Sequence, residues 1–339
     1  MRREYWQNRC WALLAAATAL TVALTAAHAD TRVVRIAKQY GISYLPLTIM
    51  QEKKLLEAEG KKMGLDLATE WLRFTGGPPM NEALISGNLD FASGGVGPLV
   101  TIWARTQGNL KVKGISALNS MPLYLNSISP NVKTIADFTD KDRIALPAVR
   151  VSMQAVILQM AAEKVFGRGQ EHKLDAWTVS LSHPDGLAQM MSGKSEITAH
   201  FTSAPFMYTE LADKRVHRVL NSYDVFGGPH TFNVVWASAK LYEGEPRIVQ
   251  AFLAALRAAI KQIEDDPAAA AALWVNADKS KLTPAEAERI IRDKENTWTL
   301  TPQKVMVVAD YMARVKMIPV APKGWKDMFI DAVHDLPGS

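Results

Sequence analysis

The chain has 339 residues, of which 48% are hydrophobic, a formal net charge of +5 and a single cysteine. This length allows about two domains, each with its own core. The charge excess is small and its signs are mixed along the sequence, which excludes the basic surface typical of nucleic-acid-binding proteins.

The N-terminus has the pattern of a cleavable signal peptide. A basic start is followed by an apolar run over residues 11–25, which is shorter than the ~20 residues that span a membrane. An A-x-A site ends at Ala29, so we expect residues 1–29 to be removed by cleavage after Ala29 and the protein to be periplasmic. Because Cys10 lies in this segment, the mature chain would have no disulfide, thiol nucleophile or cysteine metal ligand.

Strands and helices alternate in the first part of the mature chain. Strands are predicted over residues 33–38 and 67–74, separated by a loop at 39–41 and helical sequence to about Gly60. A helix near 98–106 precedes extended segments at 111–117 and 123–129. This βαβ alternation indicates a largely parallel sheet with helices on its faces.

After residue 128 the same kind of pattern begins again. Strands are predicted at 143–146 and 177–180, and a helix over 152–166 is capped by Ser152. A strand at 232–241 then leads back to the first lobe, and helices follow at 246–264, after the Thr283 capping box and after Thr301. We therefore expect lobe I at 30–128 plus 236–339, lobe II at 129–235, and a double crossing that acts as a hinge.

The same succession of helix, glycine, strand and turn is predicted twice at a constant offset, at residues 78–101 and again at 184–206. In each copy a proline opens an apolar-periodic run, which ends at Gly87 in the first copy and at Gly193 in the second. Short strands are expected next, at 89–92 and 195–199, followed by turns at 93–97 and 200–203. Two related α/β lobes facing each other form a cleft, and a cleft favours a small ligand.

Five predicted loops follow strands on the cleft side. In open α/β sheets ligands bind beyond the carboxyl ends of strands, where helix N-termini offer free N–H groups. The candidate ligand-binding residues in these loops are Gln39, Tyr40, Gly41, Thr75, Gly76, Gly77, Ser93, Gly94, Arg150, Ser152, His200 and Thr202. Glycine allows close backbone approach, and the hydroxyl and amide side chains supply uncharged hydrogen bonds.

The candidate residues suit a small anion such as a sulfonate, nitrate or an organic carboxylate. Arg150 is the basic residue among them and would pair with the head group or else remain a solvated surface side chain. Tyr40, Tyr44 and Phe201 leave room for an organic tail.

Sequence motifs for catalysis or metal binding are weak throughout the chain. His183 and His200 lack the spacing of metal ligands, so loop contact or helix capping explains them better. We find no nucleophile motif and no carboxylate pair for acid–base catalysis, and therefore expect no enzyme activity, no cofactor and no metal.

Several short motifs together resemble one protein family. They include RIAKQYG at 35–41, FTGGPP at 74–79 and EALISGNLDFA at 82–92, with further matches at 135–138, 143–147, 184–196 and 204–206. In these motifs the chain is similar to the periplasmic solute-binding proteins of nitrate/sulfonate/taurine-type ABC importers.

The resemblance implies an α/β, two-lobed periplasmic-binding-protein fold of type II, each lobe a doubly wound mixed sheet flanked by helices. It also implies a monomer that closes about a hinge on a small anionic ligand and delivers it to the membrane permease and ATPase subunits. An enzyme on the same scaffold and a periplasmic ligand sensor are the alternatives.

Overall fold

The structure of the protein, a computed structural model, describes residues 31–339. The expected signal peptide and its cleavage site lie outside these residues. Within residues 31–339, no helix combines the length and the apolar character needed to cross a membrane.

Five strands form the sheet of the first lobe. They are β1 (Arg32–Lys38), β2 (Leu67–Arg73), β3 (Ala92–Gly95), β4 (Lys113–Ala117) and β11 (Asn233–Ala237). β1 pairs with β2, and β11 lies antiparallel between β3 and β4. A parallel bridge from Ile36 to Phe91 joins the two groups, so the strand order is β2-β1-β3-β11-β4.

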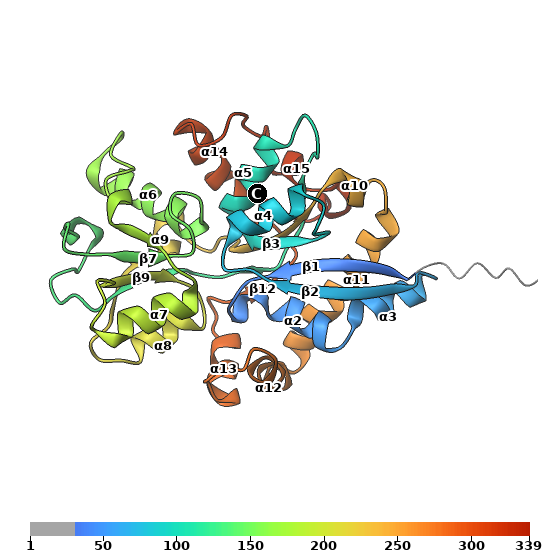
Figure 1. Cartoon of the computed structure of the whole chain (residues 1–339), viewed down its shortest axis with the longest axis horizontal. Coiled ribbons are helices and arrows are strands. Elements are labelled where there is room, and N and C mark those ends of the chain that lie inside the picture. The colour runs from blue at the N-terminus through green and yellow to red at the C-terminus, as the bar shows by residue number, and fades with distance from the viewer. Residues whose placement is uncertain (1–30) are drawn as a thin grey trace, which may run out of the picture. The chain divides into compact units, whose positions relative to one another are not determined.

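Helices from both ends of the chain are grouped around the first sheet, some directly on it and others packed on those helices (Figure 1). They are α2 (Leu45–Glu52), α3 (Leu55–Lys62), α4 (Gly77–Ile85), α5 (Val96–Arg105), α11 (Pro246–Asp265), α12 (Pro267–Ala277), α13 (Pro284–Ile291) and α14 (Val305–Arg314). α11 packs on α2 and α3. Its apolar stripe is buried, and Phe252 stacks on Phe91 with ring centroids 4.1 Å apart.

The second lobe repeats this architecture. Its strands are β6 (Tyr124–Ser127), β7 (Ile144–Leu146), β8 (Thr178–Ser180), β9 (Ala199–Thr202) and β10 (His217–Asn221). Their order is β8-β7-β9-β6-β10, with β7 parallel to β8 and β9, and β6 antiparallel to β9 and β10. The antiparallel strand therefore occupies the same place in both sheets.

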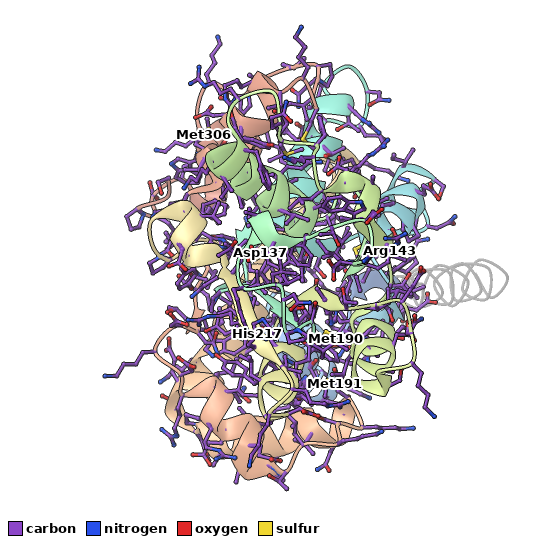
Figure 2. All side chains as sticks on the ribbon, turned by 90° about the vertical axis from the view of Figure 1, so that its left-hand side faces the viewer. Asp137, Arg143, Met190, Met191, His217 and Met306 are labelled. Carbon is purple, nitrogen blue, oxygen red and sulfur yellow. The ribbon has the colours of Figure 1, made fainter. Side chains whose placement is uncertain are left out.

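Four helices flank the second sheet, and Figure 1 shows α6 on the opposite side of β7 and β9 from α7 and α8. They are α6 (Met153–Phe166), α7 (His183–Ser192), α8 (Phe206–Leu211) and α9 (Ser222–Phe226). Met190 of α7, labelled in Figure 2, is fully buried beside Ala145, Ile197 and Val216. Short elements complete the chain: β5 (Asn119–Ser120), β12 (Thr297–Trp298), α10 (Ala239–Tyr242), α15 (Trp325–Met328), and 3-10 turns at Ile42–Tyr44, Ile135–Asp137, Asp175–Trp177 and Asp331–Val333.

The internal repeat is confirmed, but its strands begin later than predicted. α4 and α7 correspond, and both end at a glycine in the left-handed region, with φ 74° at Gly87 and 63° at Gly193. The strands that follow begin at Ala92 and Ala199, whereas they were predicted to begin at residues 89 and 195. The small residues of 93–95 were interpreted as part of a turn, whereas they belong to the central strand β3, over which large side chains pack.

The crossings between the lobes also lie a few residues earlier than expected. β6, beginning at Tyr124, already belongs to the second sheet, and β11 enters the first sheet at Asn233. Each crossing strand pairs in the middle of the other sheet through backbone hydrogen bonds. Backbone pairing leaves no side-chain pattern that marks the boundary between the lobes. The lobe boundaries predicted at residues 129 and 236 therefore lie a few residues too late in the sequence.

Candidate functional site

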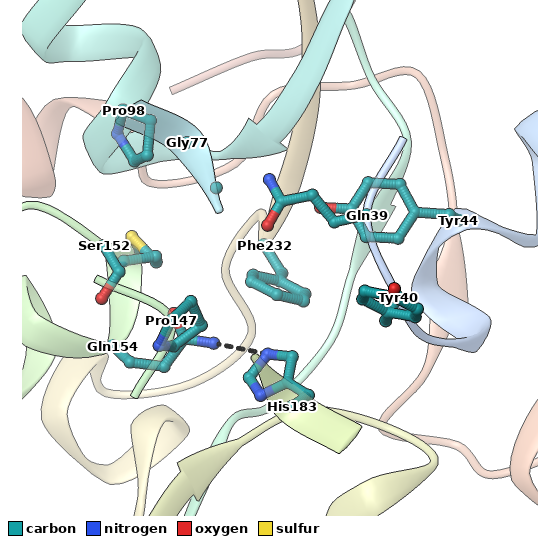
Figure 3. Close-up of a pocket in the computed structure, with 12 residues that line it drawn as sticks. Gln39, Tyr40, Tyr44, Gly77, Pro98, Pro147, Ser152, Gln154, His183 and Phe232 are labelled. Carbon is teal, nitrogen blue, oxygen red and sulfur yellow. Dashed lines mark hydrogen bonds between the residues drawn. The ribbon is translucent and has the colours of Figure 1, made fainter. Parts of the chain in front are cut away.

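A cavity of about 20 Å³ lies between the two lobes, at the carboxyl ends of their strands. Figure 3 shows its walls, with Gln39, Tyr40 and Tyr44 facing Ser152, Gln154 and His183. The other lining residues are Gly77, Gly95, Pro98, Pro147, Met153 and Phe232. A volume of this size holds about one water molecule, so the lobes leave little free space here.

Glycines of the first lobe allow this close approach. A Cβ atom on Gly95 would lie 2.6 Å from Cβ of Met153 in the opposite lobe. On Gly76 it would lie 3.1 Å from the carbonyl oxygen of Pro147, and on Gly41 2.9 Å from that of Ala204. A side chain at any of these positions would crowd the opposite lobe, so the two lobes approach each other closely at these glycines.

Four of the predicted site residues line the cavity. Gln39 and Tyr40 follow β1, Gly77 is the first residue of α4, and Ser152 caps α6 as expected, its Oγ accepting from the N–H of Ala155 at 3.2 Å. Gly41 and Gly76 do not line it but form the neighbouring lobe contacts.

Four other candidates lie within strands, in contrast to the expected loops. Ser93 is fully buried and donates to the carbonyl oxygen of Ala37 at 2.5 Å, which ties β3 to β1. Gly94 packs under Trp236, whose ring would lie 3.0 Å from an added Cβ. His200 and Thr202 are buried in β9, as is Phe201, which belongs to the core. Because both strands were predicted three to four residues too early, interior positions were taken for cleft loops.

Arg150 and Thr75 are exposed, and neither lines the cavity. The Arg150 side chain is 76% exposed, and its Nε lies 4.0 Å from Oδ2 of Asp175. Its φ of 66° places it in the left-handed region, within the turn that ends at the Ser152 cap. Arg150 is therefore a surface side chain, which was one of the two expectations for it. It contributes no positive charge to the cavity lining.

His183 is the main residue of the cavity that sequence reasoning missed. It begins α7 at the position that Gly77 occupies at the start of α4, and both residues line the cavity. The repeat itself carried this signal, because a site residue in one copy has an equivalent in the other. Gln154 was missed as well, since the first turn of α6 follows the predicted loop.

The ring of His183 is held from three sides. Its Nε2 lies 3.3 Å from Nε2 of Gln154, the contact dashed in Figure 3. Its Nδ1 lies 3.2 Å from Nε2 of His200 and 3.0 Å from Oγ1 of Thr202. Burial, and then the neighbouring His200, hold the pKa of His183 well below its usual value, so the ring is neutral at pH 7.

Charged side chains gather behind Tyr40, outside the cavity. The Arg73 guanidinium lies 5.1 Å from the centre of the Tyr40 ring and donates to Oδ1 of Asp278 at 2.7 Å. Nζ of Lys38 lies 3.8 Å from the same carboxylate. Burial lowers the pKa of Lys38 to about 8, although Asp278 opposes this change. Within residues 31–339, the cavity lining itself contains no Lys, Arg, Asp or Glu.

A larger groove of about 550 Å³ adjoins the cavity at Tyr40, which lines both. Its walls are mainly apolar, with Leu187 and Met191 of α7, Phe206 and Trp274 among them. Residues from both lobes contribute, so the groove extends the space between them. Its volume lies within the range of small-molecule binding sites.

Comparison with known proteins identifies the fold. No protein-family model matches the sequence, and no curated protein matches it. The alkanesulfonate-binding protein of Xanthomonas axonopodis pv. citri, solved with bound MOPS, superposes with a TM-score of 0.67 at 18% identity, covering 86% of this chain and 96% of that one.

Two further solved structures agree with this likeness. The periplasmic aliphatic sulphonate-binding protein of Escherichia coli has a TM-score of 0.64 at 18% identity, covering 88% of this chain and 99% of that one. The periplasmic nitrate-binding protein of Synechocystis PCC 6803 has a TM-score of 0.66 at 13% identity, covering 86% and 83%. The resemblance seen in the sequence motifs thus holds at the level of the fold: the chain has the two-lobed α/β fold of the periplasmic binding proteins.

Proposed function

We propose that this protein is the periplasmic substrate-binding component of an ABC importer, and that it captures a small organic anion between its lobes by hinge closure. The observation that carries the proposal is the cavity at the strand ends, walled by both lobes of a binding-protein fold. The similarity to sulfonate- and nitrate-binding proteins supports it.

An oxyanion head group suits the donors that surround the cavity. The N-terminus of α6, a helix of 14 residues, lies at Ser152, and α4 begins at Gly77 on the opposite wall. Helix N-termini attract negative charge, and uncharged donors of Gln39 and His183 complete the set. The head group would therefore be held by dipoles and hydrogen bonds, without a salt bridge.

The apolar groove favours a ligand with an organic tail. The cavity is too small for more than a head group, whereas the adjoining groove offers about 550 Å³. An organic sulfonate or carboxylate would place its tail past Tyr40, along α7. Nitrate would leave the groove empty, so we rank nitrate below the organic anions as the ligand of this protein.

Delivery to the membrane would follow release from the cleft. We propose that the exported protein is a monomer that docks on the permease of an importer driven by an ATPase. Export would use the basic and apolar N-terminal segment, with cleavage after Ala29.

Native mass spectrometry of the protein purified from its own host tests the proposal directly. We expect one bound anion, recovered with its mass unchanged, and a smaller radius of gyration in X-ray scattering when ligand is present. A thermal-shift panel of nitrate, ethanesulfonate, benzenesulfonate and benzoate then defines the class. Tight binding of a neutral or cationic compound with all anions inert contradicts the proposal, and conversion of the bound compound would establish an enzyme.

Two variants locate the site. Ser152→Ala should weaken binding of the selected anion, because Ser152 lines the cavity and organises the N-terminus of α6. Arg150→Ala is the matched control, since this side chain points into solvent one turn away. A loss of affinity in Arg150→Ala of ~1.5–3 kcal/mol, the contribution of a charged hydrogen bond, would place the head group elsewhere.

A further inference from the structure

A chain of buried polar groups runs from the cavity wall into the second lobe. Beyond His183 it continues through His200, whose Nδ1 lies 2.6 Å from Oε1 of Glu210. The other carboxylate oxygen of Glu210 accepts from the amide of Asn126 at 2.9 Å. His200, Glu210 and Asn126 are all fully buried.

Glu210 requires a positive partner because an isolated carboxylate in the interior is very unfavourable. Among the residues that the structure describes, the basic group within 4.0 Å of its oxygens is His200. The short distance between Nδ1 and Oε1 fits a charge-assisted hydrogen bond. Glu210 and His200 therefore form one buried hydrogen-bonded pair that acts on its surroundings as a unit.

The protonation of this unit decides what His183 presents to the cavity. When His200 is protonated on both nitrogens, it donates to Glu210 and to Nδ1 of His183, so Nε2 of His183 carries the hydrogen and is a donor. When the Glu210–His200 pair has lost this proton, Nδ1 of His200 donates to the Glu210 carboxylate and its Nε2 accepts from Nδ1 of His183. Nε2 of His183 then holds a lone pair, toward which the amide nitrogen of Gln154 is directed.

We propose that an oxyanion in the cavity accepts a hydrogen bond from Nε2 of His183, and that its binding draws one proton from solvent into the Glu210–His200 pair. This inference rests on the proposed function, since it concerns the same cavity. An oxyanion can only accept, so it binds the donor state and is repelled by the lone pair of the other state. Glu210 and His200 are positioning residues here, because they act on the ligand through His183.

The surroundings of α7 leave few other groups that could titrate with ligand. β9 contributes His200, α8 contributes Glu210, and β7 presents only apolar residues. On α7 itself, Asp185 accepts from the hydroxyl of Ser182 at 2.5 Å.

Across the cavity the titratable groups are phenols and one charged cluster. Burial raises the pKa of Tyr44, which keeps it protonated. Tyr40 is the other phenol, and behind it Lys38 and Arg73 surround Asp278.

Thr202 offers a rival explanation without proton uptake. Its hydroxyl, 3.0 Å from Nδ1 of His183, could donate to that nitrogen and produce the same donor at Nε2 while His200 stays neutral. In that case binding would be independent of the Glu210–His200 pair, and Thr202→Val would remove the donor state. The two explanations therefore differ in the number of protons taken up and in the variant that matters.

Isothermal titration calorimetry in two buffers of different ionisation enthalpy counts these protons. The probes are benzenesulfonate and ethanesulfonate, which remain anionic from about pH 6 to about pH 9, the range in which histidine charge is adjustable. Benzoate and nitrate complete the panel. We expect uptake that approaches one proton per bound anion as pH rises, with affinity falling up to tenfold per pH unit.

Three variants test whether the proton taken up on binding resides on the Glu210–His200 pair. Glu210→Gln keeps the shape of the side chain but removes its charge, so uptake should vanish and affinity should become independent of pH. Glu163→Gln, which removes a carboxylate paired with Arg314 away from the cavity, should retain the wild-type uptake. Thr202→Val should retain it too.

Binding of an anion by the wild-type protein without proton uptake at any pH from about 6 to about 9 overturns this inference and leaves the proposed function standing. This measurement needs no variant, so it decides the matter even if Glu210→Gln fails to fold. Loss of binding in Thr202→Val, with uptake absent, would establish the rival explanation. If none of the four anions binds, the proposed function and this inference both fall.

Discussion

A single added methyl group at Gly186 tests whether His200 is held as tightly as the structure shows. Gly186 lies in α7, directly over the ring of His200. A Cβ atom there would lie 2.6 Å from Nε2 and 2.9 Å from both Cδ2 and Cε1. The ring has little room to retreat, because it is fully buried and bonded to Glu210 on its far side.

The magnitude follows from three contributions to the free energy of unfolding of Gly186→Ala. Alanine stabilises a helix interior by about 1 kcal/mol relative to glycine. Overpacking costs about 1–3 kcal/mol, and loss of the contact between His200 and His183 costs about 1 kcal/mol more. The net expectation is a destabilisation of about 1–3 kcal/mol, although the substitution favours the helix.

Thermal and urea unfolding, followed by tryptophan fluorescence, measure this change. Gly108→Ala is the matched control, because a Cβ at Gly108 would meet nothing within 4 Å. This control should stay within about 0.5 kcal/mol of wild type. If Gly186→Ala were as stable as wild type or more stable, the ring of His200 would have to be loosely held, and the argument for a fixed chain from Glu210 to His183 would be lost.

Three other changes have defined outcomes. Gly95→Ala should lower anion affinity about 5- to 150-fold in calorimetry, since an overpacking cost of about 1–3 kcal/mol against Met153 falls on the closed state; unchanged affinity would show that closure does not need this contact. Burial lowers the pKa of His230 from 6.5 to about 4. The unfolded chain therefore binds the extra proton between these values, and this contribution to stability is complete above about pH 6.5 and is lost as pH falls toward 4. Urea titrations should show a smaller acid loss in His230→Gln, and an equal loss in both proteins would contradict the assignment. The bidentate pair of Arg314 with Glu163, at 2.8 and 2.6 Å, joins α14 to α6 but is half exposed, so Arg314→Gln should cost at most about 1 kcal/mol and lose its effect in high salt.

The sequence by itself determined the features that depend on neighbouring residues. Ser152 and Thr283 cap the helices that they were expected to cap, because capping needs only the next turn of backbone. Gly87 and Gly193 end their helices in the left-handed region, so the repeat was visible before any tertiary contact. From the repeat and the alternation of strands and helices, two α/β lobes followed.

Only the tertiary structure decided which side chains meet in the cleft. His200 and Thr202 are interior because β9 lies between β7 and β6 in the sheet. Both of these neighbouring strands come from segments far from β9 in the sequence. Arg150 is exposed although it belongs to a predicted cleft loop, and it adopts a positive φ within that turn. His183 reaches the cavity, and contacts His200, because Gly186 leaves space for that ring. These outcomes depend on packing between segments far apart in the chain, for which the periodicity of any one segment carries no signal.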